Sequence, residues 1–234
     1  AEADAALLTA IDLEQDGPRR VRSLSDRTRS GLVAFSAQME PEGFDVVSSS
    51  PVPAVHHAYA RLRARHDRVH LLAPDLRSRP GGALSMPCSA AFVDAVAVHD
   101  DAPAEQHMRL TPEGTRGTFE IALDWLNGPD RPSAVLCCTG YQAVALRLAA
   151  ARAGVEVPEE LEIIAIGDVP AEAELLGPIS YYGVDDVFAR LSGVVVDRAV
   201  ERGDRPGRLH RFDWEYFPGT TTRDDETSRS TDDR

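Results

Sequence analysis

The sequence contains no lysine and no long hydrophobic run, and each absence narrows the class of protein. All 25 basic residues are arginines, and 38 acidic residues outnumber them, which gives a net charge of −13. A surface of that charge repels phosphate backbones, so we expect this chain to bind nucleic acid poorly on its own. No apolar stretch approaches the roughly 18 residues that a membrane-spanning helix needs. Residues 1–16 show no basic region followed by an apolar one, so we expect no signal peptide.

Cysteine is scarce, which limits disulfide and metal chemistry. The three cysteines are Cys88, Cys137 and Cys138. An odd number without regular spacing argues against a disulfide framework, and no CxxC pair or histidine-rich cluster indicates a metal site. Cys137 and Cys138 lie in an apolar run over residues 134–138, so we expect them to be small buried residues of a strand.

Signatures of catalysis are also missing. The sequence has no GxSxG nucleophile elbow, no GxxxxGK[ST] phosphate loop and no GxGxxG fingerprint. Three polar pairs have structural explanations beside functional ones. His56-His57 is expected on a helix surface, where neighbouring side chains cannot reach one metal ion. Asp185-Asp186 either caps a helix or contacts a ligand, and Tyr181-Tyr182 either packs in the protein or stacks on a ligand. We therefore predict no catalytic residues, no metal site and no cofactor.

Apolar, strand-like runs alternate with helical segments along the chain. Strands are predicted at residues 7–11, 31–35, 44–48, 69–73, 134–138, 161–166 and 209–217. Helices are predicted at residues 18–29, 53–66, 89–97, 115–126, 141–153 and 187–202. This alternation predicts βαβ units and a mostly parallel sheet, the mark of an α/β fold. Such sheets bind ligands beyond the carboxyl ends of their strands, which places a ligand near residues 138–141 and 167–169.

Four segments in the second half of the chain resemble one known family. Residues 132–146 read PSAVLCCTGYQAVAL, and residues 153–170 read AGVEVPEELEIIAIGDVP. Residues 178–182, PISYY, and 217–223, FPGTTTR, follow in the same order. Together with the strand, helix and basic turn over residues 46–72, they are similar to the core of lactose/galactose-repressor (LacI/GalR) family transcription regulators. The resemblance covers most of the chain from about residue 46 to 223.

The resemblance implies a two-lobe, periplasmic-binding-protein-like α/β core with parallel sheets flanked by helices. The first lobe would comprise residues 1–48 and 185–212, and the second residues 49–184 and 213–222, with a disordered tail at 223–234. Such proteins are cytoplasmic homodimers that bind a small effector in a cleft. They bind operator DNA through a helix-turn-helix head, a segment missing from this chain. Compared with the family, strands and helices are missing at the start of the first lobe and between residues 37 and 44. Either the lobe is reduced or the sequence omits these segments, and we favour the second because a parallel sheet without its central strand would expose unpaired edges.

The resemblance also implies site residues, at which this sequence departs from the family. Thr139-Gly140 replaces the family's Asn-Asp, Gly167 replaces the first Asp of a G-[FY]-D-D turn, and Cys88 and Asp186 replace a ligand-clamping Arg and a stacking aromatic. Without those charged and amide groups we expect an effector smaller or more apolar than a typical sugar, or a lobe that senses no ligand. The predicted effector-binding residues are Cys88, Thr139, Tyr141, Gly167, Asp168 and Asp186.

A dimer interface is expected along the helix at residues 141–153 and the segment at 175–182. Its predicted residues are Gln142, Leu146, Ala149, Leu176, Ile179 and Tyr181. The small residues of that helix would let a partner helix approach closely, or they simply pack on the lobe's own sheet. Two other functions remain open: a free-standing solute-binding protein of the same fold, and an α/β enzyme. An upstream signal peptide would favour the first, and a grouped nucleophile, base and orienting residue would favour the second.

Overall fold

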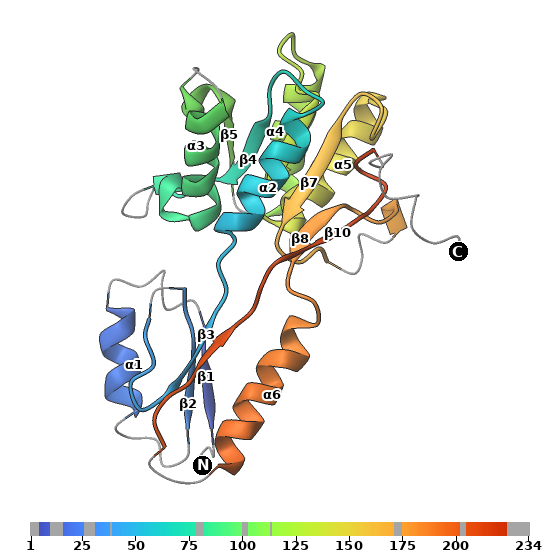
Figure 1. Ribbon diagram of the computed structural model, residues 1–234. Coiled ribbons are helices and arrows are strands. Elements are labelled where there is room, and N and C mark those ends of the chain that lie inside the picture. Colours follow the sequence, from blue (N-terminus) through green and yellow to red (C-terminus); the bar gives the residue numbers. More distant parts are fainter. Residues whose placement is uncertain are drawn as a thin grey trace. The chain divides into compact units, whose positions relative to one another are not determined.

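The protein is described here from a computed structural model (Figure 1). The structure describes residues 5–9, 16–25, 31–37, 39–77, 82–99, 103–112, 114–170, 175–201 and 205–223. The chain divides into two compact units. Unit 1 comprises Ala1–Ser50 and Val184–Trp214, and unit 2 comprises Pro51–Gly183 and Glu215–Arg234. The predicted lobe boundaries at residues 48, 185 and 212 lie close to these divisions.

Unit 1 is built on a four-stranded parallel sheet. Its strands are β1 (Ala6–Leu8), β2 (Leu32–Phe35), β3 (Asp45–Ser48) and β9 (Leu209–Arg211), in the order β1-β2-β3-β9. Two helices, α1 (Gly17–Ser25) and α6 (Val187–Val200), cover its opposite faces (Figure 1).

Alternating side chains of the central strands fill the two cores of unit 1. Leu32 and Ala34 of β2 pack with Val21 of α1, whereas Val33 between them packs with Leu191 of α6. This alternation follows from the period of two along a strand. It explains why β2 is apolar on both faces, as expected of a strand covered by helices on each side.

Unit 2 is built on a six-stranded sheet. Its strands are β4 (His70–Pro74), β5 (Met108–Thr111), β6 (Ala134–Cys137), β7 (Glu162–Ile166), β8 (Tyr181–Gly183) and β10 (Glu215–Phe217). The order is β10-β8-β7-β6-β4-β5, and every pair is parallel except β10 with β8. The α/β fold with parallel-rich sheets, predicted from the sequence, is therefore confirmed.

The described part of unit 2 also contains four helices and short 3-10 segments. The helices are α2 (Val52–Arg63), α3 (Pro87–His99), α4 (Thr115–Asn127) and α5 (Gly140–Ala153), and the 3-10 segments are η2 (Gly82–Ser85) and η3 (Ala104–His107). Helix α2 packs with α3, and α4 packs closely with α5 (Figure 1). None of the helices in the described part of the chain is long and apolar enough to cross a membrane.

Three strand predictions need correction. Strands β5 and β8 were not predicted from the sequence, and residues 209–217 were predicted to form a single strand. That segment forms β9 in the sheet of unit 1 and β10 in the sheet of unit 2, with Phe212–Trp214 between them. The predicted disordered tail lies outside the described residues beyond Arg223, as do parts of the segments predicted at 7–11 and 18–29.

Candidate functional site

A pocket in unit 2 lies beyond the carboxyl ends of three adjacent strands, where the parallel sheet predicts a ligand. Strands β4, β5 and β6 are neighbours in the sheet and end at Pro74, Thr111 and Cys137. The pocket has a volume of about 380 Å³. It is lined by Pro74, Pro112, Gly114, Thr115, Thr118, Thr139, Tyr141 and Gln142. Two predicted effector-binding residues, Thr139 and Tyr141, are therefore brought together.

The beginning of α5 fixes the polar groups of this pocket. The Thr139 hydroxyl caps the helix by accepting from the backbone N–H of Gln142 (3.3 Å). The Gln142 side chain donates from Nε2 to Oγ1 of Thr111 (3.0 Å), and the Thr111 hydroxyl donates to the carbonyl of Ala73 (3.4 Å). This chain of hydrogen bonds ties α5 to β5 and β4. The ring of Tyr141 is 62% exposed, so it is available to contact a ligand.

The turn after β7 packs against the same end of α5. Gly167 has a φ of +106°, a conformation that favours glycine. A Cβ on Gly140 would lie 2.2 Å from the carbonyl oxygen of Asp168 and 2.6 Å from Cα of Val169. Gly140 therefore permits the turn to touch the helix. Partial burial raises the pKa of the Asp168 carboxyl, but neither Gly167 nor Asp168 lines the pocket.

Cys88 lies in the interior of unit 2, on α3. It is 3% exposed. The neighbouring thiol of Cys138, the residue before Thr139, and burial raise the pKa of the Cys88 thiol well above its usual value, so the thiol is neutral. All three cysteines are free and buried, as expected of Cys137 and Cys138. Cys88 is therefore a buried residue of α3 that does not line the pocket.

Asp186 belongs to unit 1. It occupies the position before the first turn of α6, as the capping interpretation expected, but its side chain makes no capping hydrogen bond. Its φ of 45° places it in the left-handed region, unusual for a residue with a side chain. Whether this carboxylate contacts a ligand stays a prediction.

Four of the six predicted interface residues are core residues in this structure. Leu146, Ala149 and Ile179 belong to the core of unit 2, and Gln142 is 5% exposed and engaged with Thr111. These four side chains are buried in unit 2, and the dimer interface itself stays a prediction. The small residues of α5 pack within the unit's own core, the alternative left open above. Leu176 and Tyr181 are half-buried, and the Tyr181 ring stacks on Phe217 at 4.7 Å between centroids.

The remaining lining residues were missed by the sequence analysis. Thr115 and Thr118 lie on the first turn of α4, which the sequence placed correctly, but nothing in its pattern shows which end of a neighbouring strand it faces. Gln142 was assigned to the interface on resemblance alone. Among the described residues, no group of three or more His, Cys, Asp or Glu side chains is arranged to hold a metal ion.

Comparisons with known proteins agree with this architecture. Residues 60–187, more than half of the chain, match the sequence model of the periplasmic binding protein-like domain. The chain therefore belongs to the periplasmic binding protein-like domain family. No relative among the curated proteins matches it.

Solved structures identify the particular fold within that class: it is the fold of LacI-family transcription regulators. A regulator of that family from Lactobacillus casei with bound glucose is 15% identical and has a TM-score of 0.74, with 94% of this chain and 79% of that chain covered. One from Clostridium acetobutylicum is 14% identical, with a TM-score of 0.72 and coverage of 92% and 77%. One from Enterococcus faecium with bound ribose is 14% identical, with a TM-score of 0.69 and coverage of 94% and 80%.

Proposed function

We propose that this chain is the effector-sensing and dimerisation core of a LacI-type transcription regulator that acts in the cytoplasm. The observation that carries the proposal is the pocket at the carboxyl edge of β4, β5 and β6, in a fold shared with regulators that hold glucose and ribose. Ligand sites of doubly wound sheets lie at this edge. The operator would be bound by a helix-turn-helix head that lies outside these 234 residues.

The lining of the pocket favours a compact, uncharged effector. Its eight described residues contribute three hydroxyls from threonines, one amide, one tyrosine ring and two prolines, and none of them carries a charge. Hydroxyl and amide groups fix a few polar atoms of a ligand, while an aromatic face takes its apolar side. The volume of about 380 Å³ is at the small end of ligand pockets. We therefore propose a neutral molecule no larger than a monosaccharide.

Regulation follows from a difference in affinity between two states of the regulator. An effector shifts the equilibrium only as far as it binds one state better than the other. The hydrogen bonds from Thr139 through Gln142 to Thr111 are well placed for this, because they join α5 to two strands. We expect the dimer to transmit the shift to DNA binding.

The test is a thermal-shift screen of the chain against neutral monosaccharides, polyols, nucleobases and small apolar metabolites. A ligand at one hundred times its dissociation constant stabilises the folded state by about 2.7 kcal/mol, which a melting curve resolves easily. The hit is then titrated into Tyr141→Ala and Tyr141→Phe. Loss of binding in the alanine variant with retention in the phenylalanine variant supports stacking on this ring. A ligand bound equally by wild type and Tyr141→Ala contradicts the site.

A further inference from the structure

A second and larger cavity lies at the opposite edge of the same sheet. Its volume is about 780 Å³, within the range of ligand sites. It opens where β4, β5 and β6 begin, and its walls include His70, His107, Arg68, Arg109, Arg131 and Trp125. The two cavities therefore lie at opposite ends of the same three strands. They also lie at opposite ends of α4, which contributes Thr115 and Thr118 to the smaller cavity and Trp125 to the larger one.

Three arginines line the larger cavity, in a chain whose net charge is −13. Arg68 and Arg109 are exposed and have no ion-pair partner among the described residues, whereas Arg131 pairs with Glu160 (2.8 Å). The guanidinium of Arg109 lies 5.2 Å from the ring centroid of Trp125, a cation–π contact that holds it at the wall. Two carboxylates, Asp67 and Asp130, also line the cavity, and in the described part of the chain neither forms an ion pair with Arg68 or Arg109. Guanidinium groups bind carboxylate and phosphate oxygens in a bidentate manner.

Two imidazoles with buried Nδ1 atoms line this cavity. His107 is 4% exposed, and its ring lies 5.6 Å from that of the half-buried His70. Among the described residues, the Nδ1 atom of neither ring has a hydrogen-bond partner. An unpaired buried polar atom is unfavourable, so such atoms usually have a partner. A ligand hydroxyl or an ordered water in the cavity would supply one.

His70 is neutral at neutral pH. Burial, then the charges of His107 and Arg68, lower its pKa to about 4, while a hydrogen bond to the backbone of Ala134 opposes them. A neutral imidazole has one N–H donor and one acceptor nitrogen. Because a hydroxyl group both donates and accepts, it can pair with the Nδ1 atom of His70 in either tautomer.

We infer that this cavity is a second ligand site, which binds a small hydroxylated oxyanion. Arg68 and Arg109 bind the carboxylate or phosphate oxygens, and the imidazoles of His70 and His107 bind hydroxyl groups. The ligand class differs from the neutral effector proposed for the smaller pocket. The inference does not depend on that proposal, because it uses none of the same residues.

Trp125 provides a direct readout of binding. The chain has two tryptophans, and the other is Trp214 in unit 1. In a Trp214→Phe background, the fluorescence of Trp125 is followed while citrate or glycerol 2-phosphate is added at constant ionic strength. Both probes combine oxyanions with a hydroxyl, and they separate a carboxylate source from a phosphate source. We expect a saturable change with at least one probe.

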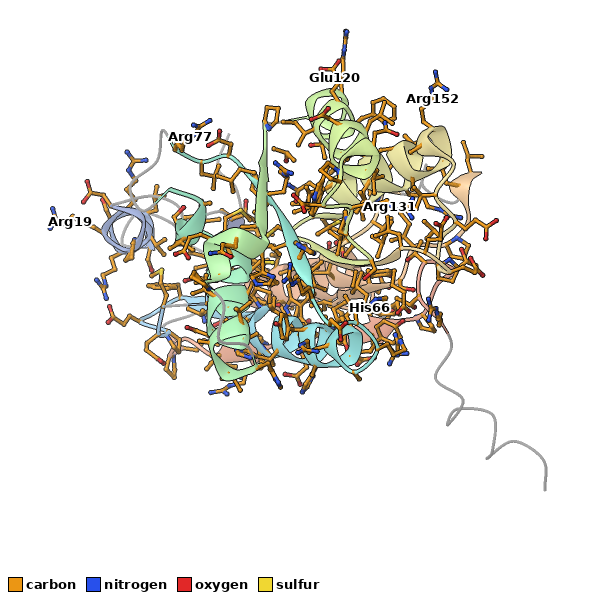
Figure 2. All side chains as sticks on the ribbon, turned by 90° about the horizontal axis from the view of Figure 1, so that it is seen from above. Arg19, His66, Arg77, Glu120, Arg131 and Arg152 are labelled. Carbon is orange, nitrogen blue, oxygen red and sulfur yellow. The ribbon has the colours of Figure 1, made fainter. Side chains whose placement is uncertain are left out.

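Charge-removing variants locate the site. Arg109→Gln and Arg68→Gln should each weaken the apparent affinity by about tenfold, because each removes a charge-assisted pair of hydrogen bonds. Because Arg109 also contacts Trp125, the Arg68→Gln variant keeps the test valid if Arg109→Gln folds poorly. Arg152→Gln is the matched control: Arg152 projects outward from α5 (Figure 2) and does not line the cavity. Its affinity should equal that of the parent, as should that of Tyr141→Ala.

Two outcomes overturn the inference. One is the absence of a saturable change with both probes in a folded protein. The other is an equal affinity in Arg68→Gln and in Arg152→Gln, which would mean that the anion responds to net charge alone. Failure of the neutral-effector screen bears only on the smaller pocket, whereas failure here bears only on the larger one.

Discussion

Gly140 is the residue on which the shape of the candidate effector site depends most. Its missing side chain lets the turn at Asp168 and Val169 touch the start of α5. We predict that Gly140→Ala lowers the free energy of unfolding by about 1–3 kcal/mol, because the new methyl group meets backbone atoms that cannot move cheaply. The change should also weaken effector binding, since α5 carries Thr139 and Tyr141. Urea denaturation of both proteins measures the first effect.

The control is the same substitution at Gly193, inside α6. A Cβ there meets nothing within 4 Å. Because alanine favours a helix over glycine, Gly193→Ala should stabilise unit 1 by about 0.5–1 kcal/mol. If Gly140→Ala is as stable as the parent, the turn after β7 can move to admit the methyl group. Its close packing on α5 then contributes little to stability.

His70 makes the stability of unit 2 depend on pH. Its pKa in the folded state, about 4, lies below the ordinary value of 6.5, with burial as the largest cause. Between these values the unfolded chain binds a proton that the folded protein does not, so stability is full above pH 6.5 and falls as the pH drops towards 4. Urea midpoints across this range should slope less in His70→Gln than in His57→Gln, an exposed histidine of α2. Equal slopes would contradict the burial of His70 as the cause.

The sequence indicated Thr139 and Tyr141 of the smaller pocket but not His70 and His107 of the larger cavity. Thr139 and Tyr141 were recognisable because they follow an apolar strand and begin a helix, so their place at a carboxyl edge follows from chain order. His70 and His107 carry no such signal. They are 37 residues apart in the sequence, and their contact exists only because β4 and β5 pair in the sheet. Their burial and the lowered pKa of His70 come from that tertiary contact.

At the scale of elements, one buried carboxylate joins three segments of unit 2. Glu162, at the start of β7, is fully buried and accepts from Arg65 (2.9 Å), from His66 (2.6 Å) and from the backbone N–H of Arg223 (2.6 Å). It thereby ties the end of α2 and the last described residue to the sheet. We predict that Glu162→Gln costs about 3 kcal/mol, because it removes the buried negative charge that pairs with the Arg65 guanidinium. Glu160→Gln, which breaks an exposed pair with Arg131, should change stability little.

The same carboxylate sets a second acid transition. Burial alone would raise the pKa of Glu162, but hydrogen bonds from His66, Arg65 and Arg223 outweigh it and lower the pKa to about 2 from 4.5. The resulting stability is fully present above pH 4.5 and is lost as the pH falls towards 2. In Glu162→Gln the acid unfolding curve should lose this component. Retention of the full slope below pH 4.5 would assign it to other carboxylates.

Most helices and the longer strands could be predicted because their apolar period is clear. Helix α4 and strand β7 are examples, since each carries an uninterrupted pattern on the face or faces that it buries. Strand β5 was missed because Met108–Thr111 is a short edge strand with an exposed arginine. Strands β9 and β10 were joined because residues 209–217 are continuously strand-like. Only the tertiary fold shows that their backbones pair in two different sheets.

At the scale of the whole molecule, both units are assembled from distant parts of the chain. Unit 1 needs residues 184–214 to complete a sheet and a core begun by residues 1–50, and unit 2 receives β10 from the end of the chain. The local sequence pattern cannot predict that distant segments complete these units, because it carries no information on which strands pair. The resemblance to a family predicted two lobes that share distant parts of the chain, because the order of its segments implies a topology. Residue patterns predicted the single elements.

The proposed dimer would form through the outward side of α5. The inward side of α5 is filled by Ala143, Leu146 and Ala149, so a partner would meet its outward side, where Leu148 is 37% exposed. We predict that the wild-type chain sediments as a dimer and that Leu148→Arg sediments as a monomer with an unchanged melting temperature.

The reason is that an arginine opposite its own symmetry copy must be desolvated beside a like charge. Val98→Arg is the matched control, because Val98 is 74% exposed on α3 and lies outside the proposed interface. It should leave the dimer intact. If both variants dissociate, net charge rather than this helix face governs assembly. If neither variant dissociates, the dimer interface lies elsewhere on the protein. The outward side of α5 then serves only the effector pocket, to which it contributes Tyr141.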